Sequence, residues 1–243
     1  MIDTHCHIDQ YDNPESVAEA CRTRRITTIA VTSLPEHYLM AKKHLAGNDF
    51  VHPALGLHPL VAAQNTNHVV SFERLSKDCD YIGEIGLDGS KSGLPTLPKQ
   101  IEVFDRVLAA IAGRPRFVTL HSRGAVAEVL KCLNVHAMYP VVFHWFSGTK
   151  SELSAVLDAG HFLSFNPSMA DTAKWQTEIT RIPLARILTE TDGPYTKVGH
   201  RKSRPADVLT VLEWFSEKFR RPRPEIERVV RSNFFALTKA RLP

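Results

Sequence analysis

A short apolar run followed by a helical pattern recurs along this chain of 243 residues, and it does so eight times. The units follow one another without a fixed-period repeat, a low-complexity tract or a long Gly/Ser linker. Strands that alternate with helices predict a parallel sheet, and eight such units fit a closed (β/α)8 barrel better than an open doubly wound sheet. We therefore expect one α/β domain, a (β/α)8 TIM barrel over residues 1–243.

The expected strands and helices alternate in chain order. After the N-terminal strand, strands are expected at 26–31, 51–57, 81–85, 117–120, 141–143, 162–165 and 186–188. Helices are expected at 14–24, 35–46, 69–77, 99–112, 125–133, 151–159, 171–181 and 205–219. Pro222 and Pro224 precede one more helix at 225–239, whose apolar residues recur at helical spacing. We expect this last helix to close one end of the barrel.

The composition is that of an ordinary globular protein, with 43% hydrophobic and 23% charged residues, which argues against a disordered or fibrous chain. No apolar run approaches the roughly 20 residues that span a bilayer, and the first residues lack the pattern of a signal peptide. The four cysteines lie far apart without a CxxC pair, which indicates reduced thiols. We expect a soluble, cytoplasmic protein with no membrane partner, and its net charge of +4 permits an anionic partner.

Histidines and carboxylates stand at the carboxyl ends of most of the expected strands. They are His5, His7, His58, Glu84, His121, His144 and Asp192. Each of them alone is a common structural or solvated residue. A barrel, however, gathers the carboxyl ends of all its strands around one mouth, so these widely spaced residues are predicted to converge on one site.

The types of these side chains point to metal binding. Residues two apart in a strand share a face, so His5 and His7 point the same way, while Cys6 points to the opposite side and packs there. Imidazoles and carboxylates suit zinc, manganese or magnesium, and the lack of cysteine ligands argues against a closed structural zinc site. The set exceeds the needs of one ion, which predicts two divalent metal ions close together. Asp3 and Asp9 are expected to orient the histidines, cap the turn or meet metal.

The motifs that carry these residues resemble a known series. DTHCHID, ALGLHP, GEIGLD, LHSRGA, HWFSG and LTETDGPY, in this order, are similar to the motifs of TatD-type metal-dependent deoxyribonucleases in the amidohydrolase superfamily. The resemblance covers the chain from Ile2 to about Leu237. It implies a distorted TIM barrel with divalent metal ions at its mouth, in which a metal-activated water hydrolyses phosphodiester bonds of DNA.

The resemblance also implies roles for single residues. His5, His7 and Asp192 would hold one ion, His121 and His144 the other, and Glu84 would bridge them. Asp192 would also orient or deprotonate the attacking water, so Asp192 and Glu84 are the expected catalytic residues. His58 and Arg123 would touch substrate phosphate, unless His58 is structural and Arg123 is solvated. Glu190 would support the site rather than bind metal.

Two segments depart from the housekeeping members of that family, GSKSGLPTLPKQ after Asp88 and GHRKSRP before the last helices. Both belong to loops at the mouth, so substrate shape and exonuclease preference are not carried over. GLDGS, HWFSG, ETDGP and the compact length look more like the QatD branch, the TatD-like component of Qat anti-phage systems. That resemblance implies a role in bacterial antiviral defence alongside other Qat proteins.

A basic segment follows Asp192 and is expected to lie over the mouth. It contains Lys197, His200, Arg201, Lys202 and Arg204. These cations either bind the phosphates of a DNA strand, with Arg201 as the expected substrate contact, or belong to a solvated loop.

Two other functions remain open. The same set of histidines and aspartate occurs in small-molecule amidohydrolases such as deaminases and lactonases, but many of these place a modified lysine at the bridging position, where this chain has Glu84. A catalytically silent subunit of a defence complex would be expected to have lost metal ligands. All six expected ligands are present in this sequence.

Overall fold

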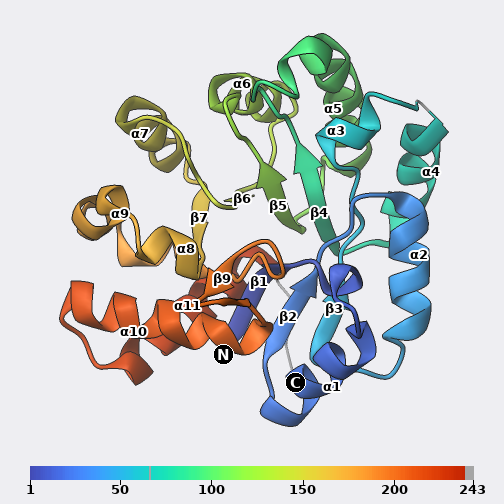
Figure 1. The fold of residues 1–243 in the computed structure, drawn as a ribbon. Coiled ribbons are helices and arrows are strands. Elements are labelled where there is room, and N and C mark those ends of the chain that lie inside the picture. The colour runs from blue at the N-terminus through green and yellow to red at the C-terminus, as the bar shows by residue number, and fades with distance from the viewer. Residues whose placement is uncertain (66, 239–243) are drawn as a thin grey trace.

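The computed structural model describes residues 1–65 and 67–238, and in this part of the chain eight strands lie in sequence order inside a ring of helices (Figure 1). The strands are β1 (Ile2–Cys6), β2 (Thr27–Ala30), β3 (Val51–Pro53), β4 (Tyr81–Gly86), β5 (Phe117–His121), β6 (Val142–Phe143), β7 (Phe162–Phe165) and β8 (Ile187–Thr189). All of the pairings between neighbouring strands of this series are parallel. The predicted (β/α)8 architecture is confirmed.

The helices follow the strands as expected. They are α1 (Pro14–Arg24), α2 (Pro35–His44), α3 (Pro59–Ala62), α4 (Asn67–Leu75), α5 (Leu97–Ile111), α6 (Val126–Val135), α7 (Lys150–Asp158), α8 (Pro167–Ala170), α9 (Ala173–Glu178), α10 (Val208–Phe219) and α11 (Arg223–Thr238). A hairpin of two short strands, β9 (Lys197–Val198) and β10 (Arg201–Lys202), stands outside the ring of parallel strands.

The cylinder of strands is distorted, because its backbone ladder is interrupted at two places. One sheet contains β1, β2 and β3, the other runs from β4 to β8, and on one side an isolated bridge between Leu55 and Ile82 lies between them. On the other side, side chains connect β8 to β1: Thr4 Oγ1 donates to the carbonyl of Thr189 at 2.9 Å, and Thr189 Oγ1 donates to the carbonyl of Ile2 at 2.5 Å. These buried hydrogen bonds hold the first and last strands together without a regular ladder.

Thr32, which follows β2, forms hydrogen bonds with β4 and with the segment that follows β3. Its amide donates to the carbonyl of Gly83 and its carbonyl accepts from the amide of Glu84, both at 3.0 Å. Its hydroxyl donates to the carbonyl of Ala54 at 2.9 Å. Gly56 is required here, because a Cβ at that position would lie 1.6 Å from the carbonyl oxygen of Thr32. This close approach fixes the backbone from which the side chain of Glu84 projects.

The last helix closes the end of the barrel where the strands begin. Phe234 of α11 is fully buried, and its ring lies 5.3 Å from the ring of Phe117, the first residue of β5. Asn233 Nδ2 donates to the carbonyl of Ile187 at 2.8 Å, and the N-terminal ammonium lies 2.8 Å from Glu227. The predicted closing helix is thus confirmed to Thr238, while Lys239, its expected last residue, lies outside the described residues.

Three local elements differ from the expectation. The helix predicted at 171–181 is shorter than expected: α9 covers Ala173–Glu178 and is capped by Thr172, which accepts from the amide of Trp175. The separate helix α8 lies before the predicted range. The short helix α3 begins at Pro59, with the side chain of His58 as its N-cap. The hairpin β9–β10 was not predicted either, since its strands are too short to show an apolar alternation.

The four cysteines are buried and free of disulfide bonds. Among the residues that the structure describes, no helix combines the length and the apolar character needed to cross a bilayer.

Replacing Phe234 by Ala is predicted to lower the free energy of unfolding by roughly 3–5 kcal/mol, because it leaves a cavity under the barrel. The neighbouring substitution Phe235→Ala removes the same side chain from a partly exposed position and should cost much less. Urea denaturation of both variants measures the difference. Equal losses of stability would contradict a closing role for α11.

Candidate metal centre

The carboxylate of Glu84, on β4, lies at the centre of a ring of imidazoles. Its Oε1 is 2.8 Å from Nδ1 of His121, at the end of β5, and 2.8 Å from Nε2 of His144, directly after β6. Three strand ends thus place one carboxylate and two imidazoles in direct contact. We refer to these residues, together with His5, His7, His58 and Asp192, as the Glu84 cluster.

The second oxygen of Glu84 faces the other histidines of the cluster. Its Oε2 is 3.5 Å from Nε2 of His7, 3.7 Å from Nε2 of His58 and 3.9 Å from Nε2 of His5. Asp192 Oδ1 lies 3.5 Å from Nε2 of His7 and 3.7 Å from Nε2 of His5. The structure therefore brings together all six residues that were predicted as metal ligands, and His58 with them.

Backbone hydrogen bonds lock the two segments that carry Asp192 and the paired histidines. The amide of Asp192 donates to the carbonyl of His5, and the amide of His7 donates to the carbonyl of Gly193, both at 2.8 Å. Asp192 itself has a positive φ of 48°, a conformation that aspartate tolerates better than most residues. In this local turn the carboxylate of Asp192 faces the imidazoles of His5 and His7.

Asp3 supports this connection rather than facing the cluster. Its fully buried carboxylate accepts from the amide of Thr191 at 2.9 Å, from the hydroxyl of Thr191 at 2.5 Å and from the amide of His5 at 3.3 Å. Asp3 thus positions both His5 and the residue before Asp192. Asp9 is more exposed, and its Oδ2 lies 3.7 Å from Nδ1 of His37.

Hydrogen bonds behind the imidazoles fix their orientation. His5 Nδ1 lies 2.8 Å from Oγ1 of Thr119, which leaves its Nε2 to point into the cluster. Glu190 accepts from Nδ2 of Asn166 at 3.0 Å and from the amide of Trp145 at 3.1 Å, and its Oε1 is 3.8 Å from Nδ1 of His144. Glu190 is therefore placed behind His144, as expected for a supporting residue.

Asp88 contacts the Glu84 cluster, a role that the sequence did not predict. Its Oδ2 lies 2.8 Å from Nε2 of His121, so this imidazole is held between two carboxylates, Asp88 and Glu84. Its Oδ1 accepts from the amide of Ser90 at 2.8 Å. Burial would raise the pKa of Asp88, but these hydrogen bonds lower it on balance. Asp88 is the last residue of the motif GEIGLD.

The charges of the cluster depend strongly on one another. Burial alone would raise the pKa of Glu84, but the imidazoles of His58 and His144 and the hydrogen bonds of the ring bring that pKa well below its ordinary value. Burial lowers the pKa of His5 well below its ordinary value, and the nearby His144 adds to the effect. Burial also raises the pKa of Asp192 to about 7. These shifts favour an ionised Glu84 carboxylate and a neutral His5 imidazole, the forms in which these two groups bind metal.

Several buried polar atoms of the cluster lack a hydrogen-bond partner within the described residues. They are Nε2 of His5, Nδ1 of His7, Nδ1 of His144 and Oδ1 of Asp192. An unpaired buried polar atom is costly, and such atoms normally find a partner. Three sets, each with ligand atoms within 4.8 Å of one another, could hold a cation: His5 with His144 and Asp192, His5 with His7 and Glu84, and His58 with Glu84 and His121. The residues present thus fit divalent metal ions.

The cluster opens into a cleft of about 670 Å³. Arg123 and His58 line this cleft, and so do two aromatic residues that the sequence did not single out, Trp145 and Tyr195. Arg201 is not among the lining residues: its guanidinium forms two hydrogen bonds of 2.6 Å with the carboxylate of Asp207. The cleft therefore offers one exposed arginine and exposed aromatic rings next to the cluster.

Known proteins are similar to this chain in sequence and in fold. A family model described as TatD related DNase matches residues 2–239. The putative deoxyribonuclease tatdn3 of Danio rerio is 27% identical over 238 residues, which cover 89% of each chain. The uncharacterized metal-dependent hydrolase YcfH of Escherichia coli K12 is 28% identical over 256 residues, covering 98% of this chain and 95% of its own. The crystal structure of YJJV, a TatD homologue from Escherichia coli K12, matches 99% of this chain and 98% of its own with a TM-score of 0.82 at 23% identity.

Replacing Asp192 by Asn is predicted to stabilise the metal-free protein at neutral and alkaline pH. The pKa of Asp192 is about 7 in the folded protein against an ordinary 3.8, so the folded state binds this proton more tightly than the unfolded state. The wild type should therefore lose stability relative to the variant as the pH rises from about 4 through about 7, by roughly 1.4 kcal/mol per unit of pKa shift. Urea denaturation with a chelator over this pH range measures the difference.

The exposed substitution Asp12→Asn serves as the control, since it makes the same chemical change at the surface. A constant difference between wild type and Asp192→Asn over the whole range would contradict the raised pKa of Asp192.

Proposed function

The chain belongs to the family of TatD-related DNases and is a metal-dependent hydrolase, and from this premise we propose that it hydrolyses phosphodiester bonds of DNA with the help of two divalent metal ions. The observation that carries the proposal is the Glu84 cluster, in which buried ligand atoms converge and several lack a partner within the described residues. The relatives that are named deoxyribonucleases, in Danio rerio and Homo sapiens, support DNA as the substrate.

The two oxygens of Glu84 support its assignment as the bridge between two ions. Oε1 contacts His121 and His144, while Oε2 faces His5 and His7, so each oxygen of the carboxylate is directed at a different pair of imidazoles. We assign His5, His7 and Asp192 to one ion, and His121 and His144 to the other. Magnesium, manganese and zinc are all compatible with this mixed set of oxygen and nitrogen ligands.

The remaining chemistry follows from the side chains around the ions. Divalent ions bound here would polarise the phosphate and make water a stronger nucleophile at neutral pH. Asp192, which lines the cleft, would orient the attacking water and accept its proton. Arg123 and His58 line the same cleft and would bind the phosphate oxygens. In the reaction, water oxygen bonds to phosphorus, the bond to the leaving ester oxygen breaks, and that oxygen keeps the electron pair.

We further propose that the protein acts in the bacterial cytoplasm in anti-phage defence, together with other Qat proteins. The support is the set of motifs GLDGS, HWFSG and ETDGP, which look like those of the QatD branch. The protein can be both a subunit of such a complex and an active nuclease, because the Glu84 cluster contains every expected ligand.

The nuclease proposal predicts metal-dependent cleavage that Asp192→Asn abolishes. The purified protein is stripped of metal and given single-stranded DNA, duplex DNA, RNA or small ester and amide substrates, with magnesium, manganese or zinc in turn. We expect DNA cleavage only with metal, and a loss on the order of 100-fold or more in Asp192→Asn and Glu84→Gln, because each removes a charged ligand of the cluster. The surface variant Asp12→Asn should retain activity.

Two results would contradict the nuclease proposal. Metal-independent cleavage, or equal cleavage by wild type and Asp192→Asn, would exclude a metal mechanism. Hydrolysis of small amides without any cleavage of DNA would indicate a small-molecule amidohydrolase instead.

The defence proposal predicts that phage protection needs the metal ligands. Bacteria that carry the gene with its genomic neighbours should plate a sensitive phage less efficiently than bacteria that carry Asp192→Asn in the same context. Equal plating in both strains, with both proteins expressed, would contradict a catalytic role in defence.

A further inference from the structure

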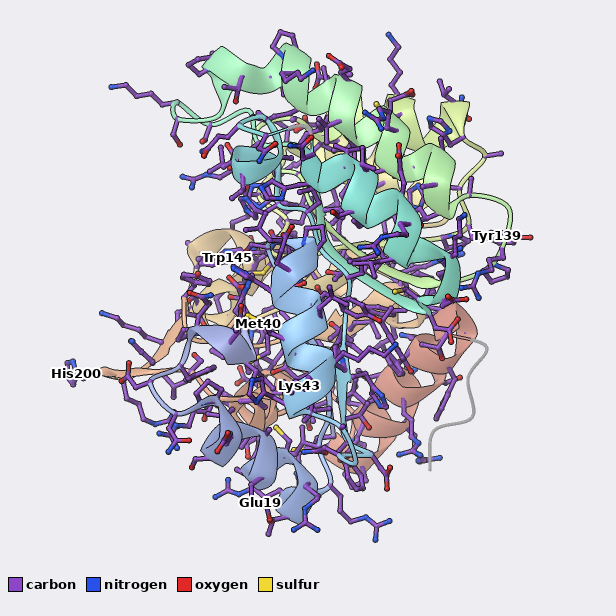
Figure 2. All side chains as sticks on the ribbon, turned by 90° about the vertical axis from the view of Figure 1, so that its right-hand side faces the viewer. Glu19, Met40, Lys43, Tyr139, Trp145 and His200 are labelled. Carbon is purple, nitrogen blue, oxygen red and sulfur yellow. The ribbon has the colours of Figure 1, made fainter. Side chains whose placement is uncertain are left out.

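The hairpin β9–β10 stands directly beside the cleft. Tyr195, two residues before β9, lines the cleft, and its ring lies 5.0 Å from that of His7. His200, at the tip of the hairpin, projects from the side of the molecule that faces away from α11, whose red ribbon lies at the lower right of Figure 2. A strand of substrate that leaves the cleft past Tyr195 would therefore meet the hairpin.

One face of the hairpin is fixed to the body of the protein. Arg201 forms two hydrogen bonds of 2.6 Å with the carboxylate of Asp207, which also accepts from the amide of Arg204 at 2.8 Å. Thr196 Oγ1 donates to Oγ of Ser203 at 2.7 Å at the base of the hairpin. Arg201 is therefore occupied by Asp207, and the hairpin has a defined position.

The other face carries two lysines directly opposite each other. In the antiparallel register Lys202 pairs with Lys197, while Arg201 pairs with Val198, so the two lysines share the face that Arg201 does not occupy. Both lysines are exposed, and neither makes an ion pair or a side-chain hydrogen bond with a residue that the structure describes. Like charges directly opposite each other in a sheet are destabilising, and an anion between them would relieve the repulsion.

Exposed aromatic rings line the cleft next to the cluster. Tyr195 is 58% exposed and Trp145 is 38% exposed, and both line the cleft. The other two tryptophans, Trp175 and Trp214, are buried. Exposed aromatic rings beside unpaired cations are typical of surfaces that bind nucleic acid strands, because the rings stack on bases while the cations meet phosphates.

We infer that Lys197 and Lys202 bind the backbone phosphates of a nucleic acid strand outside the cleft, and that Tyr195 and Trp145 stack on its bases. This inference rests on the proposed nuclease function and deepens it: the substrate is a polynucleotide that extends beyond the phosphodiester being cleaved. It also replaces Arg201, the expected substrate contact, by the two lysines of the opposite face. An acidic peptide would pair with the lysines, but it has no bases on which the aromatic rings could stack.

The test compares two double variants of the full chain. Lys197→Ala/Lys202→Ala removes both charges of the hairpin face. Lys42→Ala/Lys43→Ala removes the same charge from exposed lysines at the end of α2, where Figure 2 labels Lys43. Fluorescence anisotropy measures the binding of a labelled single-stranded oligonucleotide of twelve nucleotides over a series of salt concentrations, with and without metal.

We expect the slope of log affinity against log salt to fall by about 1.4 in the hairpin variant, since two phosphate contacts at about 0.7 each are lost, and to stay unchanged in the α2 variant. The KM for oligonucleotide hydrolysis should rise in the hairpin variant by a larger factor than the KM for bis(p-nitrophenyl) phosphate, which has only one phosphate. Equal salt slopes in both double variants, or binding of polyglutamate as tight as that of the oligonucleotide, would overturn the inference.

Tryptophan fluorescence tests the aromatic part of the surface. Addition of an unlabelled oligonucleotide should quench the emission of the wild type, because Trp145 is the exposed tryptophan, and should leave that of Trp145→Leu almost unchanged. The variant should also bind the oligonucleotide roughly tenfold or more weakly. Unchanged quenching in Trp145→Leu would contradict stacking on this ring.

These measurements separate the inference from the proposed function. If DNA is cleaved but the hairpin and α2 variants behave alike, the inference fails and the nuclease function stands. If neither DNA nor the small diester is cleaved with any metal, the nuclease function fails, and the anisotropy comparison still decides whether the hairpin binds the strand.

Discussion

The contacts of the Glu84 carboxylate are the constraint on which the rest of this structure depends. One buried carboxylate meets His121 and His144 at 2.8 Å and faces further imidazoles through its other oxygen, so residues far apart in sequence must meet within a few ångströms. A barrel satisfies this requirement, because the carboxyl ends of its strands converge. The backbone around Thr32 and Gly56 and the bonds of Asp3 to Thr191 hold these strand ends in place.

The cluster is arranged for ligands rather than for stability. Asp192 is buried with a raised pKa and a positive φ, and its Oδ1 finds no hydrogen-bond partner among the described residues. Each of these features costs free energy in the metal-free protein. Divalent cations would turn the same features into favourable contacts, so ion binding and stability should be linked in this chain. Functional sites commonly concentrate such locally unfavourable choices.

The sequence predicted those parts of the molecule that follow a periodic pattern. The alternation of strands and helices predicted the barrel, and the period of two in β1 correctly predicted that Cys6 turns away from His5 and His7, since Cys6 packs with Ile8 and Val17 on the other side. Residues in the loops were harder to predict. Asp88, Trp145 and Tyr195 follow strand ends without any repeating pattern, and the ion pair of Arg201 with Asp207 spans a turn that the sequence does not define. The position of Arg201 in the sequence predicted that it lies near the mouth. The register of the hairpin shows in addition that Lys197 and Lys202 lie on the face opposite Arg201, where they are free to bind a ligand.

The central claim, that the Glu84 cluster is a centre for two divalent ions, is tested most directly by anomalous X-ray diffraction from crystals loaded with manganese or zinc. We predict two anomalous peaks roughly 3.5–4 Å apart on either side of the Glu84 carboxylate. One peak should lie beside His5, His7 and Asp192, and the other beside His121 and His144. Loaded crystals whose anomalous peaks all lie away from this cluster, or that show none, would contradict the account.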